Sequence, residues 1–269
     1  MTEGALAGVQ WLASADNGPR LGRVAEQSVI EWSDIGHLTI AETEATFFPR
    51  PGVDHGLLAK FVATDLLACR RYLSGLLSIH ASAVAWPSGG IALVGESGAG
   101  KSTTAMALVE RGGAAFLADD IVPLDIVGNS QALIQPVEDA FWLGEDSRVA
   151  FGIADPSTKS KRACAPRARA REAAPLRCIV QLVFDNGADK PELSRLSGQD
   201  TFVVLSRSQV SFSFGDVDAV VRDLEIRARL AACVPLLSLR RRRSFDALPV
   251  VTELLLECGM GKWATEAGK

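Results

Sequence analysis

An apolar run and the glycine-rich octapeptide that follows it constrain the fold of this chain more than any other feature. Residues 91–94 read Ile-Ala-Leu-Val, and Gly95 to Ser102 fit the pattern Gly-x-x-x-x-Gly-Lys-Ser/Thr. In this pattern a buried strand leads to a loop whose glycines let backbone N–H groups converge on phosphate oxygens. The sequence therefore predicts an α/β fold that binds a nucleoside triphosphate, or descends from one that did. The alternative is a glycine-rich turn that matches by accident.

The positions in and after the octapeptide have separate predicted tasks. Lys101 supplies a positive charge for the β- and γ-phosphates, and the Ser102 hydroxyl can ligate Mg²⁺. A helix expected from Lys101 to about Glu110 points the positive end of its dipole at the same anion. The residues expected to bind the nucleotide are Gly95, Glu96, Ser97, Gly98, Ala99, Gly100, Lys101, Ser102 and Thr103.

Composition narrows the class of protein. The 269 residues, 48% hydrophobic and 22% charged, suffice for one large domain or a core domain with a small companion. A net charge of -4 argues against nucleic acid as the main partner. No apolar run is long enough to span a bilayer, and the start of the chain lacks the features of a signal peptide. The five cysteines are widely spaced, so we expect reduced thiols in a cytoplasmic protein that contacts no membrane.

Residues 1–75 are expected to form a small β-rich portion with a connecting helix. Short alternating segments separated by breakers indicate about half a dozen strands, among them 28–32, 37–40 and 45–48. From residue 54 to about 76 apolar side chains recur at helical spacing, so a helix joins this portion to the rest. The remaining residues, 76–269, are expected to form the domain that holds the glycine-rich loop.

Two adjacent carboxylates follow an expected strand at 114–118, directly after the loop and its helix. A buried strand with carboxylates at its carboxyl end is how α/β folds hold Mg²⁺ and orient a nucleophile. Asp119 and Asp120 are therefore candidate site residues, although Asp-Asp after a strand is also a common turn. Because adjacent residues leaving a strand point to opposite sides, the two carboxylates are expected to face different tasks.

A histidine lies at the start of an expected β-hairpin. Strand 78–85, a Trp-Pro-Ser-Gly-Gly turn and strand 91–94 predict this hairpin, which leads into the glycine-rich loop. His80 is then either an active-site residue or a histidine satisfied within the core.

Two basic stretches stand out from the acidic whole. Residues 155–175 are irregular and rich in lysine and arginine, which indicates either a solvated, mobile insertion or a lid or docking strip for an anionic substrate. Arg240 to Arg243 follow an expected strand at 234–239, and one of these arginines could reach a phosphate. Further apolar segments predict a strand at 177–184 and helices at 199–206, 217–232 and 247–258.

The chain resembles the HPr kinase/phosphorylase family, whose catalytic domain is a phosphate-loop kinase unlike the eukaryotic protein kinases. The resemblance covers about residues 76 to 260, and its motifs keep the family's order with near-family spacing. The matching segments are His80–Val84, Gly95–Ser102, Glu110–Gly112 and Ala118–Asp120. It implies a phosphate-loop (P-loop) kinase core with a mixed sheet and flanking helices.

The resemblance also implies roles for single residues. His80 matches an active-site histidine, Lys101 and Ser102 match the loop lysine and serine, and Asp120 matches the catalytic base with Asp119 beside it. ATP and Mg²⁺ are the implied cofactors. The implied metal ligands are Ser102, Asp119 and, as a weaker match, Glu138. The gap between loop and acids is about one residue longer than in the family, so the division of labour between the two acids stays open.

Three functions are compatible with these motifs. The first is an ATP-dependent, Mg²⁺-requiring kinase acting on a serine hydroxyl of a peptide or small protein, such as a ribosomally made precursor peptide, because the chain is similar to divergent HPr-kinase-like proteins that modify lasso precursors. The second keeps the chemistry with a small acceptor such as free serine. The third is a nucleotide-gated binding protein that has lost transfer, which His80 and the two acids disfavour. We expect a homo-oligomer.

Overall fold

The computed structural model describes residues 6–14, 19–41, 44–128, 130–153, 161–212 and 217–261. The chain divides into two compact units. The first comprises Met1–Leu67 and Phe212–Asp223, and the second comprises Ala68–Ser211 and Leu224–Lys269. The expected boundary at residue 75 therefore differs from the observed division, which also assigns residues 212–223 to the first unit.

The first unit is built on a five-stranded antiparallel sheet in which sequential strands are neighbours. Its strands are β1 (Gln10–Ser14), β2 (Arg20–Val24), β3 (Gln27–Trp32), β4 (Gly36–Ile40) and β5 (Ala45–Pro49). Val29, Ile30 and Leu38 are buried, and the rings of Trp32 and Phe61 meet edge to face at 4.9 Å. The β-rich character expected for this part of the chain is confirmed.

The helix expected from residue 54 to 76 is divided by a π-helical turn. Asp54 caps α1 (His55–Phe61) by accepting a hydrogen bond from the Leu57 backbone N–H at 3.0 Å. The π-helical turn, Val62–Leu66, then leads into α2 (Leu67–Leu73). Thr64 Oγ1 donates to the Lys60 carbonyl at 2.9 Å, and such a side-chain bond competes with the regular backbone ladder.

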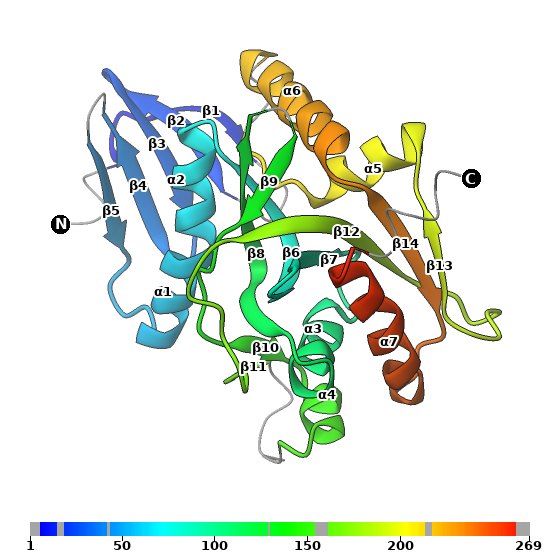
Figure 1. Ribbon diagram of the computed structural model, residues 1–269. Helices are drawn as coiled ribbons and strands as arrows, with labels where there is room; N and C mark the ends of the chain where they lie inside the picture. Colours follow the sequence, from blue (N-terminus) through cyan, green and yellow to red (C-terminus); the bar gives the residue numbers. More distant parts are fainter. Residues whose placement is uncertain are drawn as a thin grey trace. The chain divides into compact units, whose positions relative to one another are not determined.

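The second unit contains a seven-stranded mixed sheet with the order β13-β14-β12-β7-β6-β8-β9 (Figure 1). β12 is parallel to β7 and β14, whereas the β6–β7, β6–β8, β8–β9 and β13–β14 pairs are antiparallel. The strands are β6 (Leu77–Trp86), β7 (Gly89–Val94), β8 (Ala115–Val127), β9 (Gln131–Ile134), β12 (Ala174–Phe184), β13 (Glu192–Arg195) and β14 (Leu236–Arg241). A mixed α/β fold with flanking helices was expected and is confirmed.

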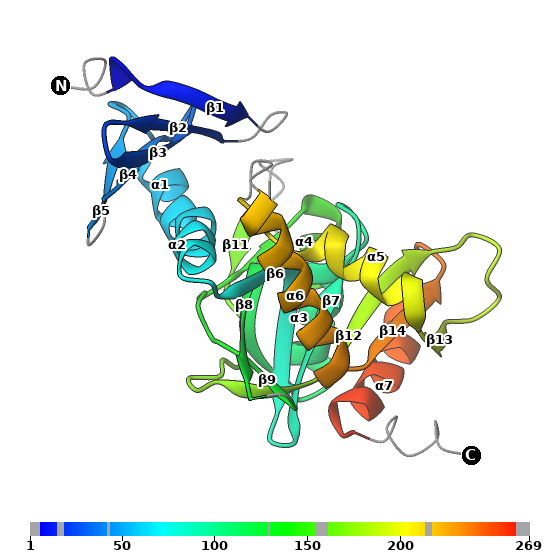
Figure 2. The same cartoon turned by 90° about the horizontal axis from the view of Figure 1, so that it is seen from above.

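Helices cover both faces of this sheet because its central strands are apolar on both sides. On one face, residues of β7 such as Ile91 and Leu93 pack with α3 (Lys101–Arg111) and α7 (Leu248–Gly259). On the other face, residues such as Ala92 and Ile79 pack with α5 (Gly198–Ser208) and α6 (Val217–Cys233), which Figure 2 shows in front of β6 and β7. None of the helices among the described residues is long and apolar enough to cross a membrane.

Two details of the sheet correct the sequence-based expectation. The hairpin turn before the glycine-rich loop is tighter than the expected Trp-Pro-Ser-Gly-Gly segment, because only Pro87 and Ser88 separate β6 from β7. The strand expected to end before Asp119 instead continues as β8 for 13 residues. Both aspartates therefore lie within a strand that pairs with β6 over most of its length, and not at a strand end.

The described part of the basic stretch is fixed to the domain. Residues 154–160, including Lys159, lie outside the described residues. β11 (Arg162–Cys164) pairs with β10 (Phe141–Leu143), and farther along Phe116 exchanges backbone hydrogen bonds with Ala168 and Ala170 at 2.9 and 2.8 Å. Arg169 forms an ion pair with Asp139. The described residues 161–175 are therefore attached to β8 and β10 by backbone pairing, and the docking strip stays a prediction.

Candidate active site

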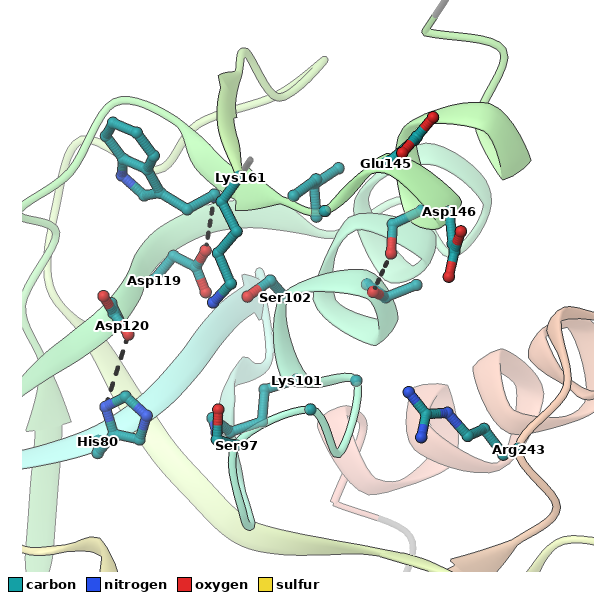
Figure 3. Close-up of a pocket in the computed structure, with 17 residues that line it drawn as sticks. His80, Ser97, Lys101, Ser102, Asp119, Asp120, Glu145, Asp146, Lys161 and Arg243 are labelled. Atoms are coloured by element: carbon teal, nitrogen blue, oxygen red, sulfur yellow. Dashed lines mark hydrogen bonds and ion pairs between the residues drawn. The ribbon is translucent and has the colours of Figure 1, made fainter. Parts of the chain in front are cut away.

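A cavity of about 420 Å³ lies where α3 begins, facing β8 (Figure 3). Its walls come from the glycine-rich loop and the start of α3, from β6 and β8, from β10 and the segment after it, and from the two basic stretches. The lining residues are His80, Ser97, Gly98, Gly100, Lys101, Ser102, Thr103, Asp119, Asp120, Trp142, Leu143, Gly144, Glu145, Asp146, Ser147, Lys161 and Arg243. Most of the predicted site residues thus meet in one place.

The glycine-rich loop has a conformation that its glycines allow. Gly100, which precedes α3, has φ 85°, and a Cβ there would lie 2.8 Å from Nη2 of Arg241. Arg241 is buried, and its guanidinium donates to the Ala99 carbonyl at 3.3 Å and to Thr104 Oγ1 at 3.2 Å. Any larger residue at Gly100 would therefore displace the arginine that supports the loop from behind.

Lys101 is held against the loop that precedes it. Only 8% of the residue is exposed, and its Nζ donates hydrogen bonds to the carbonyls of Gly95 and Glu96 at 2.9 and 3.2 Å. Burial lowers the pKa of the Lys101 ammonium, and the nearby carboxylates of Asp120 and Asp119 oppose that shift. The ammonium is thus preorganised at the cavity wall, with polar neighbours that an anion could replace.

Asp119 is a buried carboxylate held by several hydrogen bonds. Only 1% of the residue is exposed, and its two oxygens accept from Ser82 Oγ at 2.5 Å and from the Trp142 backbone N–H at 2.9 Å. Burial raises the pKa of the Asp119 carboxyl, while hydrogen bonds from Ser82, Trp142 and Ser102 lower it. The contact with Ser102 joins the strand carboxylate to the first turn of α3.

Asp120 faces the same cavity as Asp119, which corrects the expectation that the two carboxylates point to opposite sides. The reason is the backbone of Asp120, whose φ is 70°. A left-handed residue within a strand breaks the alternation of side chains, so neighbouring carboxylates can share one face. Aspartate tolerates this conformation better than most residues with a Cβ.

His80 comes from β6 and pairs with Asp120. Nδ1 of His80 lies 3.6 Å from Oδ1 of Asp120, as drawn in Figure 3. Burial lowers the pKa of His80, and the positive charges of Lys101 and Lys161 lower it further against the opposing effect of Asp120. The imidazole therefore favours its neutral form beside the carboxylate.

Some predicted residues lie outside the cavity lining. Gly95, Glu96 and Ala99 shape the loop but do not line the cavity. Glu138 lines a different hollow with Asp139 and Arg169, and its Oε1 accepts a hydrogen bond from the Asp119 backbone N–H at 3.2 Å. Glu138 thus fixes the strand at Asp119, and its carboxylate is separate from the oxygen donors that face the cavity.

Oxygen donors suited to a hard cation do gather in the cavity. They are the hydroxyl of Ser102 and the carboxylates of Asp119 and Asp120. Mg²⁺ binds through one or two carboxylates and keeps several waters or phosphate oxygens, so this donor set fits it. Within the described ranges, no group of three or more histidine, cysteine or acidic side chains is arranged to hold a metal ion without such further ligands.

The cavity also contains cations that the motifs did not single out. Lys161, the first described residue of the basic stretch, points toward Asp119 and Ser102 in Figure 3. Arg243, the last arginine of the run at 240–243, lies on the other side of the loop lysine. In the sequence both stretches were noticed only because they are basic, and the structure shows that Lys161 and Arg243 are the residues that line the cavity. Glu145 and Asp146, from α4 (Glu145–Ala150), had no sequence signal.

Comparisons with known proteins show a distant structural likeness. Among solved structures the chain is similar to the Hpr(Ser) kinase/phosphatase from Coxiella burnetii, with a TM-score of 0.37 and 13% identity over 66% of this chain and 93% of that chain. No protein-family model and no curated protein sequence matches the chain.

Proposed function

We propose that this protein is a phosphotransferase that moves the γ-phosphate of ATP to a serine hydroxyl of a peptide or small protein. The observation that carries the proposal is the shared cavity, in which Lys101 and Ser102 of the glycine-rich loop face Asp119 and Asp120 of β8. One wall offers positive charge and the other offers carboxylates, which is the combination that phosphoryl transfer needs. The acceptor class is supported by the resemblance in the sequence.

The anion-binding wall would hold the phosphates. Backbone N–H groups at the start of α3, with the helix dipole behind them, attract phosphate oxygens. The Lys101 ammonium would exchange its contacts with the Gly95 and Glu96 carbonyls for the β- and γ-phosphates. Lys161 would approach the same phosphates from the opposite wall.

Ser102 and Asp119 would hold the magnesium ion, as their hydrogen bond already brings them together. When bound, Mg²⁺ neutralises charge on the phosphate oxygens. Glu138 would act on this pair through the Asp119 backbone that it anchors. Burial of Asp119 makes its charge unfavourable in the free protein, so a cation there would be attracted strongly.

Asp120 would be the general base. The serine hydroxyl gives its proton to the Asp120 carboxylate as its oxygen forms the bond to the γ-phosphorus, and the bond from that phosphorus to ADP breaks. His80, neutral and 3.6 Å away, orients the carboxylate without neutralising it. A positioned base contributes about 10² to 10⁴ in rate.

The proposal is tested by incubating the protein with ATP, Mg²⁺ and candidate serine peptides and measuring phosphate incorporation by mass spectrometry. Lys101→Ala is expected to abolish transfer and nucleotide binding while the protein stays folded by circular dichroism. Lys190→Ala, which removes an exposed lysine outside the cavity, serves as the control. Nucleotide binding without transfer to any serine peptide or free serine would favour the gated binding protein instead.

A further inference from the structure

A second hollow adjoins the cavity on the far side of the glycine-rich loop. Its volume is about 140 Å³, and Gly98, Gly100, Thr103, Asp146, Ser147 and Arg243 line both hollows. The residues that line only the second hollow are Phe184, Arg241, Ser244, Phe245 and Leu248. We propose that this aromatic hollow binds the base of the nucleotide, an inference that rests on the phosphotransferase function proposed above.

The order of groups around the loop gives the direction of the nucleotide. Figure 3 places His80 and Asp120 on one side of Lys101 and Arg243 on the other side. The reacting γ-phosphate must lie at the end with the carboxylates, since the acceptor is activated there. A triphosphate that runs along the start of α3 then carries its nucleoside toward Arg243 and the second hollow.

The lining of the second hollow differs in character from that of the first. Phe184, at the end of β12, lies under two guanidinium groups, with Arg241 Cζ 4.9 Å and Arg243 Cζ 5.4 Å from its ring centroid. Phe245 begins the 3₁₀ turn before α7 and is 42% exposed at the rim. Bases stack on such aromatic and guanidinium faces, and stacking would cover the exposed ring.

The contacts of the arginines at 240–243 leave Arg243 as the one proposed to contact the base. Arg240 pairs with Asp185 at 2.6 Å, and Arg242 pairs with Asp189 at 3.7 Å, so both are directed to the connection between β12 and β13. Arg241 supports the loop from within, and Arg243 lines both hollows. A guanidinium can stack on a base and donate to its ring nitrogens, and a purine offers a larger stacking face, so a purine should bind better than a pyrimidine.

The test compares Mg²⁺-dependent binding of ATP, GTP, UTP and inorganic tripolyphosphate by calorimetry. For the native protein we expect purine triphosphates to bind most tightly. Phe245→Ala should weaken ATP at least about fivefold and leave tripolyphosphate unchanged, because only the base loses its contact. Phe245→Trp should keep ATP affinity. Phe202→Ala, which truncates a 37% exposed phenylalanine on α5, is the matched control and should change nothing.

The failures of the two proposals give different results. If Phe245→Ala binds ATP like the native protein while Lys101→Ala loses ATP, the base lies elsewhere and only this inference is wrong. If Phe245→Ala instead raises the KM of the acceptor peptide alone, the hollow belongs to the acceptor and the inference is also wrong. If the native protein binds neither ATP nor tripolyphosphate, the phosphotransferase function itself fails.

Discussion

Nδ1 of His80 lies 3.6 Å from Oδ1 of Asp120, across the antiparallel pair β6 and β8. The distance allows an ion pair only when the imidazole is protonated. Burial and the charges of Lys101 and Lys161 lower the pKa of His80 and so oppose that protonation. At neutral pH the side chain beside the Asp120 carboxylate is therefore an uncharged imidazole, which the proposed role of Asp120 as general base requires.

Asp120→Asn is expected to lower the rate of the transfer step by about 10² to 10⁴. The amide cannot accept the serine proton, but it keeps the size of the side chain and the wall of the cavity. Single-turnover rates beside calorimetric ATP affinity separate the two effects, and the affinity should stay close to native. Transfer at the native rate in this variant would exclude Asp120 as the base.

The pH dependence of kcat/KM should have an acid limb below pH 6.5. The lowered pKa of His80 means that it takes up a proton only below its ordinary value of 6.5. The raised pKa of Asp119 means that its carboxylate forms only above its ordinary value of 3.8. The active ionisation state, neutral His80 with ionised Asp119, is thus lost as pH falls. His80→Gln should remove the titration of the imidazole, so that the acid limb of the profile then reflects the Asp119 carboxyl alone. An unchanged pH profile would contradict this assignment.

Asp119→Asn should stabilise the ligand-free protein at neutral pH, because burial makes the charged form of this carboxyl unfavourable. The folded pKa of Asp119 is raised, so stability is lost as pH rises from the unfolded value of 3.8 through the folded value. Asparagine removes this buried charge and can keep both hydrogen-bond partners, Ser82 and the Trp142 N–H. Urea unfolding measures the change.

The same Asp119→Asn variant should lose Mg²⁺-dependent transfer. The control is Ser82→Ala, which keeps the charge, removes one hydrogen bond and should lower stability. A less stable Asp119→Asn protein with native Mg²⁺ dependence would show that the carboxylate is purely structural.

Lys161→Met should lower the transfer rate about 10- to 100-fold, the range expected when a charge-assisted hydrogen bond to phosphate is lost. Lys161 is an exposed residue, so its removal should leave the midpoint of thermal unfolding unchanged. Lys190→Met controls for the loss of one positive charge. Native kinetics in Lys161→Met would show that this lysine makes no contact with the transferred phosphate.

The hairpin, the glycine-rich loop and helix α3 were predicted from the sequence, because each is a local element whose glycine and apolar residues lie close together in the chain. The strand order was not predictable. β12 begins 80 residues after the end of β7 in the sequence, and no local sequence signal indicates that the two strands pair. The continuity of β8 was missed because Asp119 and Asp120 have the composition of a turn. Pairing with β6 overrides that preference.

The candidate site residues divide in the same way. Lys101, Ser102, Asp119 and Asp120 belong to short motifs, so the sequence predicted one site for them, and they line one cavity. Arg243 belongs to no such motif. It follows the end of β14, and only the fold brings it to the cavity, whereas Arg241 supports the loop from within. Glu138 was expected as a metal ligand from its place in the sequence, and that role stays a prediction. The fold places its carboxylate against the Asp119 backbone N–H, a contact that the sequence did not indicate.

The left-handed backbone of Asp120, with φ 70°, also has an evolutionary consequence. Glycine adopts this conformation without strain, so Asp120→Gly should preserve the strand and its pairing with β6. Aspartate and glycine codons differ by one nucleotide. A duplicated gene is therefore a single mutation away from a folded descendant that keeps its nucleotide loop but has lost its base. Under the proposed mechanism, such a descendant would bind ATP without transferring its phosphate.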